Sequence, residues 1–201
     1  MKGFRFIYIF LILVGVLAGV LLIRYNQDLR RLAKGPDKIG EIAFSREKGV
    51  SLPDGVKKVD LLFRTGTESE LEKVSSLAFR FKIPAKENQK IELVNKDGEK
   101  TDVIFPDFEL ENSGEWKFPV NKVLKADDGL TFDFAAVNSN FSGYESSEYR
   151  TLASIYLKVE GEDKSISDLV MERDSSSMLT KTRPVTNILT IPETAKYIIG
   201  N

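Results

Sequence analysis

The most constraining feature of this sequence is an uncharged stretch of 18 residues close to its N-terminus. Residues 6–23 read FIYIFLILVGVLAGVLLI, with Arg5 and Arg24 on either side. A helix of this length spans about 27 Å, which is close to the hydrocarbon thickness of a bilayer. The stretch is apolar on every side, so it would be a poor surface helix in water. We predict that residues 1–23 form a signal-anchor transmembrane helix and that the protein is a single-pass membrane protein.

Two other interpretations of this stretch stay open. Val16 and Ala18 could form the small-residue cleavage site of a signal peptide, but the apolar run continues beyond them to Ile23. The run is also longer than the apolar region of about 7–15 residues that is typical of cleaved signals. A buried core helix of a water-soluble domain is the third interpretation. We favour the retained anchor because the run is long, uncharged and close to the N-terminus.

Two sequence signals disagree on the orientation of the predicted anchor. Basic residues are more numerous in the 15 positions after the run than before it, which alone would keep the C-terminus in the cytoplasm. Large domains, however, are translocated largely regardless of charge, and a short N-terminal tail usually stays inside. We therefore expect an extracytoplasmic C-terminal domain, with the orientation open. Residues 24–38 are polar helix formers that end at Gly35-Pro36, and we predict a juxtamembrane stalk there.

From Ile39 onward, apolar residues recur with a period of two. Leu77, Phe79 and Phe81, for example, alternate with small or charged residues, as expected for strands with one buried face. The candidate strands are 41–44, 59–64, 77–83, 90–94, 101–105, 116–120, 130–134, 152–159, 165–172 and 185–191. Turn-forming Asp-Gly pairs separate several of them, and no helical periodicity of useful length follows Lys38. We predict an all-β fold, an antiparallel jelly-roll sandwich of about nine strands at residues 39–192, with a C-terminal tail at 193–201.

The composition excludes several kinds of chemistry. The 201 residues include no Cys and no His, which removes disulfides, Cys- or His-ligated metals and every mechanism with a histidine base. A net charge of −1 gives no electrostatic reason to bind nucleic acid. Acid–base chemistry could use Asp107, Glu109, Glu111, Asp127 and Asp128, and calcium could bind Asn95, Asp97, Asp127 and Asp128. Chance proximity among many acidic residues and turn formation are the simpler interpretations. We expect no enzyme activity, no cofactor and no nucleic-acid partner.

The order of motifs in the chain resembles that of cohesin-type domains. The similar motifs are KVDLLFRTGTES (58–69), VSSLAFRFKIP (74–84), TLASIYLKV (151–159), DSSSMLT (174–180) and VTNIL (185–189). Pro84-Ala85 departs from the family pattern, which has Tyr-Asp-Pro at that point. The resemblance implies a nine-stranded jelly-roll sandwich related to carbohydrate-binding modules, a group whose flat sheet faces bind protein partners or polysaccharides. The resemblance assigns no ligand-binding residue of the family to a position in this sequence.

Three aromatic residues are the candidates for ligand contact. Tyr144 and Tyr149 lie in or near a Ser/Gly-rich loop, and Trp116 could join them in a platform for sugar rings, although a single Trp is more often a core residue. We predict a membrane-anchored, non-catalytic extracytoplasmic module that binds a protein partner or a carbohydrate. The alternative is a structural or assembly component of a cell-envelope complex, whose anchor could pack through Gly15 and Gly19.

Overall fold

The computed structural model describes residues 38–46, 51–166 and 168–199. Within these ranges, no helix combines the length and the apolar character that crossing a membrane requires. The predicted anchor at residues 6–23 lies outside the described residues, and so does the predicted stalk except for Lys38. The description that follows concerns the compact unit that begins at Lys38.

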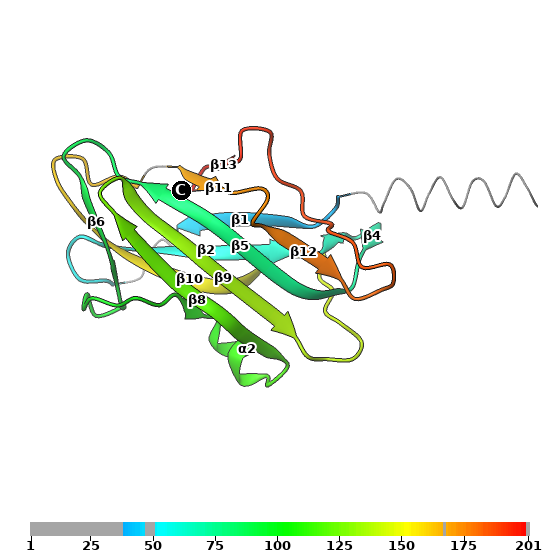
Figure 1. Cartoon of the computed structure of the whole chain (residues 1–201). Helices are drawn as coiled ribbons and strands as arrows, with labels where there is room; N and C mark the ends of the chain where they lie inside the picture. Colours follow the sequence, from blue (N-terminus) through cyan, green and yellow to red (C-terminus); the bar gives the residue numbers. More distant parts are fainter. Residues whose placement is uncertain (1–37, 47–50, 167, 200–201) are drawn as a thin grey trace, which may run out of the picture. The chain divides into compact units, whose positions relative to one another are not determined.

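Two antiparallel sheets form the body of this unit (Figure 1). The first sheet has the strand order β1 (Glu41–Arg46), β2 (Val56–Arg64), β10 (Arg150–Glu160), β6 (Lys90–Val94), and β7 (Phe105–Pro106) also pairs with β10. The second has the order β13 (Lys196–Tyr197), β11 (Leu169–Met171), β5 (Val74–Pro84), β9 (Gly129–Asn138), β8 (Trp116–Ala126), and β12 (Ser177–Thr180) also pairs with β5. A short hairpin, β3 (Gly66–Thr67) and β4 (Glu70–Leu71), and one helix, α2 (Phe108–Asn112), complete the described elements.

The core lies between the two sheets and is rich in aromatic rings. Along β5, buried apolar residues alternate with partly exposed ones, so one face of the strand is turned to the other sheet. Phe81 lies directly opposite Phe132 on β9, and their rings stack with centroids 4.9 Å apart. Phe44 on β1 meets the ring of Phe81 edge-on at 5.2 Å and so joins the two sheets. Offset and edge-to-face contacts of this kind add to the stability that burial itself provides.

The predicted all-β sandwich is confirmed, and nine of its described strands are at least three residues long. Two expected strands are wrong in detail. Only Phe105 of the candidate 101–105 enters a strand, and residues 185–191 contribute isolated bridges instead of a strand. The helix α2 was not expected. Its first turn is capped by Asp107, whose side chain accepts hydrogen bonds from the backbone of Glu109 and Leu110.

The C-terminal residues also belong to the sandwich. Within the predicted tail, Lys196 and Tyr197 form β13 and pair with Val170 and Leu169 of β11. Tyr197 is buried, and its ring lies edge-on to Phe44 at 5.5 Å. This segment therefore extends the second sheet by one short strand.

Candidate functional site

We call the outward side of the second sheet the open face. It is formed by the outward side chains of β12, β5, β9 and β8, which are Ser177, Leu179, Ser76, Ala78, Arg80, Lys82, Thr131, Asp133, Ala135, Val137, Val120, Lys122 and Leu124. Strand register arranges them in rows. Ser177, Ala78, Ala135 and Val120 lie side by side across the four strands. A flat grid of neighbouring side chains is thus available to a partner.

Small residues at the centre of the open face leave a shallow hollow of about 340 Å³. Ala78 and Ala135 form its floor, and Val120 stands beside them. Val120, Leu124 and Val137 are 42%, 44% and 40% exposed, which is high for large aliphatic side chains. Exposed apolar residues grouped on one surface mark interaction sites more often than scattered ones do.

A row of charged residues crosses the open face next to this apolar centre. Arg80 donates hydrogen bonds to both carboxylate oxygens of Asp133, with 2.8 Å between Nη2 and Oδ2, and it lies 3.7 Å from Glu172. The hydrogen bond from Arg80 lowers the pKa of the Asp133 carboxyl group. Lys82 pairs with Asp128 at the end of the strand. These charges are therefore fixed in position near neutral pH, and they can orient a partner without rearrangement.

The outward side of the first sheet also carries ion pairs. Asp60 lies 3.3 Å from Lys58 and accepts a hydrogen bond of 2.6 Å from Ser154. Glu92 is paired with both Lys90 and Lys100, at 3.1 and 2.9 Å. Among the described residues, none of the large apolar side chains that are exposed lies on β1, β2, β6 or β10, whereas β8 and β9 carry Val120, Leu124 and Val137. We therefore place the candidate docking surface on the open face.

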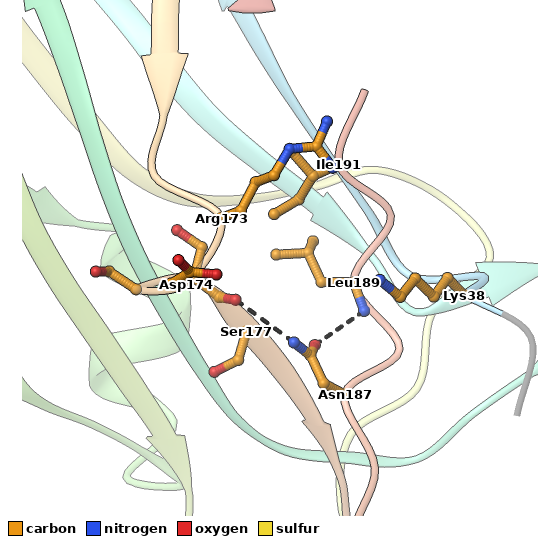
Figure 2. Close-up of a pocket in the computed structure, with 9 residues that line it drawn as sticks. Lys38, Arg173, Asp174, Ser177, Asn187, Leu189 and Ile191 are labelled. Carbon is orange, nitrogen blue, oxygen red and sulfur yellow. Dashed lines mark hydrogen bonds between the residues drawn. The ribbon is translucent and has the colours of Figure 1, made fainter. Parts of the chain in front are cut away.

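A second hollow of about 550 Å³ adjoins the open face at the gap between the end of β11 and the start of β12 (Figure 2). Ser175 lines both hollows. Figure 2 shows the side chain of Asn187, whose oxygen accepts from the backbone N–H of Leu189 at 3.1 Å. The same oxygen accepts from the backbone N–H of Met178 at 3.0 Å. Lys38 and Arg173 bring positive charge to the wall of this hollow, and Asp174 brings one negative charge. The open face therefore continues into a polar recess at its border.

Two of the three aromatic residues singled out in the sequence, Tyr144 and Tyr149, line a third hollow of about 500 Å³, which we call the tyrosine hollow. Its lining residues are Asp107, Glu109, Leu110, Tyr144, Glu145, Ser146, Tyr149, Arg150 and Thr151. The structure thus brings Tyr144 and Tyr149 together, and Tyr149 is 41% exposed. Trp116 is only 2% exposed and meets Tyr144 edge-on at 5.4 Å. It cannot offer a ring face to a ligand as expected above, because core rings surround it, and it acts as a packing residue.

Among the residues considered for metal or acid–base chemistry, Asp97, Asp127 and Asp128 are turn residues, whereas Asp107 caps α2 and Glu109 and Glu111 lie in this helix. Asp128 pairs with Lys82, and its backbone oxygen accepts from Ala85 at the end of the β8–β9 hairpin. Asp97 lies in a tight turn in which its backbone N–H bonds to the Asn95 side chain at 3.0 Å. In the described part of the chain, no group of three or more acidic residues could hold a metal ion. The sequence did not reveal the open face, because its rows depend on which strands become neighbours.

Comparison with known proteins is consistent with a cohesin-like fold. No known family and no curated protein matches the sequence. Among solved structures, the chain is similar to a type II cohesin domain from the cellulosome of Acetivibrio cellulolyticus and to type II cohesin A11 from Bacteroides cellulosolvens. Both alignments have a TM-score of 0.52 and 11% sequence identity, and both cover 79% of this chain. They cover 95% and 99% of the two cohesin chains, respectively. The resemblance noted in the sequence thus extends to the fold.

Proposed function

We propose that this protein is a non-catalytic protein-binding module that docks its partner on the open face. The observation that carries the proposal is the exposure of Val120 and Val137 beside the small residues Ala78 and Ala135. The exposed Leu124 lies on the other side of the row that contains Arg80 and Asp133. Small side chains let a partner approach the sheet closely, and the surrounding aliphatic groups then become buried. The cohesin-like fold supports the same conclusion, because cohesin-type domains bind protein partners through a flat sheet face.

The partner of this surface combines an apolar ridge with charged flanks. The ridge fills the hollow over Ala78 and Ala135, while the row that contains Arg80 and Asp133 sets its orientation. An acidic group of the partner can reach Lys38 and Arg173 in the recess at the border of the face. Apolar contact provides most of the affinity, and charge complementarity provides orientation and the rate of association.

We further propose that residues 6–23 anchor the module in a membrane, with the domain on the extracytoplasmic side. The uncharged length of this run supports the anchor. Protease treatment of intact cells tests the orientation, since an outward-facing domain is digested before lysis and an inward-facing one only after it. A role in envelope assembly remains the second candidate, supported by Gly15 and Gly19 in the run. In that case the bound partner is itself a membrane protein, and Gly15→Leu weakens the complex.

The test of docking compares two alanine-to-arginine variants of the full-length protein. Ala135→Arg places a long charged side chain in the centre of the open face. Ala43→Arg places the same side chain on the outward side of β1, between the buried Ile42 and Phe44. We expect wild type and Ala43→Arg to capture the same protein from solubilised cell envelopes and Ala135→Arg to capture none. Equal capture by both variants, with circular dichroism showing that both are folded, would refute docking on the open face.

A further inference from the structure

The tyrosine hollow lies at the end of the sandwich where α2 and the 144–151 segment meet, and it is separate from the open face. We propose that it is a binding site for an uncharged oligosaccharide. Its volume of about 500 Å³ lies within the range of about 300–1,000 Å³ that is typical of small-molecule sites. The inference rests on two tyrosine rings that are held in place and on a rim with both hydrogen-bond donors and acceptors.

Tyr149 is fixed by groups outside the hollow. Its hydroxyl donates to the Glu41 carboxylate at 2.6 Å, and the Arg64 guanidinium lies 4.8 Å from the centre of its ring. Arg64 in turn donates to Glu41 at 2.7 and 3.1 Å, which closes a three-residue network. Since neither Glu41 nor Arg64 lines the hollow, the network supports the ring and leaves part of it exposed there. A ring that is already ordered loses little entropy when a ligand binds.

Tyr144 is held from the core side. Its ring meets Trp116 at 5.4 Å and Phe63 at 5.4 Å, and both of these residues are buried. Its backbone N–H and C=O both pair with Val74, at 2.9 and 2.8 Å. The two tyrosines therefore present apolar surface whose position is set by the fold. The C–H face of a pyranose ring packs well against such surface, because this contact removes apolar area from water.

The rim of the tyrosine hollow combines both kinds of hydrogen-bonding group. Glu109 and Glu145 supply acceptors, Arg150 supplies donors, and the hydroxyl groups of Ser146 and Thr151 do either. A sugar hydroxyl donates and accepts at once, so a mixed rim can satisfy it. Asp107, Glu109 and Glu145 place three carboxylates against the single guanidinium group of Arg150, so the lining repels an anionic ligand. The combination therefore favours a polyol without acidic groups, such as a neutral sugar, over an anion.

Trp116 provides a direct probe of this site, because it is the only tryptophan in the chain and touches Tyr144. The experiment titrates the full-length protein with cellohexaose, xylohexaose, mannohexaose and N-acetylchitohexaose. Tryptophan emission and calorimetry are recorded together. We expect at least one of the four to cause a saturable change by both methods. If none of them binds, the proposal is wrong.

Variants then localise the binding. Tyr149→Ala removes a ring and is expected to lower the affinity for the sugar about tenfold or more. Tyr149→Phe retains the ring, and its affinity should stay within about threefold of wild type. Phe108→Ala removes an aromatic side chain that is 77% exposed on α2 but does not line the hollow, and it should leave affinity unchanged. Wild-type affinity in folded Tyr149→Ala would refute the site. Ala135→Arg should bind the sugar normally, so the failure of docking on the open face and the failure of this site can be told apart.

Discussion

Asn121 binds both backbone polar groups of Ile104 through its side-chain amide. Its oxygen accepts from the Ile104 N–H at 2.7 Å, and its nitrogen donates to the Ile104 C=O at 2.6 Å. Ile104 is fully buried, and Asn121 belongs to β8, which lies at the border of the second sheet. One side chain thus attaches the 101–106 segment to the sheet that carries the open face.

Asn121→Ala should lower the free energy of unfolding by about 2–4 kcal/mol, because two buried backbone groups lose their partners. Asn121→Asp retains an acceptor for the Ile104 N–H but sets a carboxylate oxygen against the Ile104 carbonyl oxygen, so it should show at least as large a loss. Urea denaturation of the two variants beside wild type measures both values. A loss below about 0.5 kcal/mol for Asn121→Ala would mean that water replaces the amide without cost.

Phe81→Ala should be among the most destabilising single changes in the described part of the chain. Phe81 is fully buried, stacks on Phe132 and meets Phe44 on the other sheet, so its removal leaves a cavity between the sheets. The expected loss is about 3–5 kcal/mol. Phe108→Ala is the matched control, since Phe108 is 77% exposed, and it should change stability by less than about 0.5 kcal/mol. Thermal and chemical unfolding of the two variants should agree on this order.

The Arg80–Asp133 pair should give the protein part of its sensitivity to acid. The hydrogen bond from Arg80 lowers the pKa of Asp133 in the folded state. The stabilisation is therefore present above the unfolded-state pKa of about 4, and it is lost as the pH falls through the folded-state pKa. Because Arg80 is 38% exposed, solvent screening limits the contribution to about 0.5–1 kcal/mol.

Asp133→Asn tests this contribution. The variant should be less stable than wild type at pH 7, and the difference should shrink in strong acid, where Asp133 is protonated in wild type. Free energies of unfolding at several pH values give both results. Asp102→Asn is the control, since the side chain of Asp102 is 80% exposed and its pair with Lys125 should contribute little. A difference between wild type and Asp133→Asn that is independent of pH would contradict the expectation.

Gly129→Ala should disrupt the turn between β8 and β9. Gly129 has φ of +135°, and a Cβ atom there would lie 2.2 Å from the backbone oxygen of Ile83. Gly114 also has positive φ, at +73°, but a Cβ atom there would meet nothing within 4 Å. We expect a loss of about 2–4 kcal/mol for Gly129→Ala and about 1 kcal/mol for Gly114→Ala. Similar losses in the two variants would show that backbone conformation, and not the contact with β5, decides the cost.

Local patterns in the sequence predicted most of the sandwich. Alternation along β5 and β10 identified buried faces, because the period of two is a property of each strand alone. The segment 185–191 was also expected to be a strand. Instead, the side-chain oxygen of Asn187 accepts hydrogen bonds from the backbone N–H groups of Met178 and Leu189. The helix α2 has five residues, which is too short for a helical period to show in the sequence.

The candidate sites depended on contacts between distant residues. The sequence identified Tyr144 and Tyr149 from their loop, but only the fold shows that they share a hollow with residues of α2. Trp116 could not be assigned to surface or core from its identity, since its burial depends on Phe63 and Tyr144. The open face likewise required the register of β5 with β9 and β8, which pairs Ala78 with Ala135 and Ala135 with Val120.

The short strands at one border of the second sheet have a consequence for self-association. β13 has two residues and β12 has four, so that border holds no continuous run of backbone groups onto which another chain could be added. Pro119 and a register shift between Lys117 and Val120 interrupt the first part of the opposite border, whereas residues 120–126 pair regularly with β9. The open face therefore exposes aliphatic side chains beside one border at which the addition of another strand is blocked.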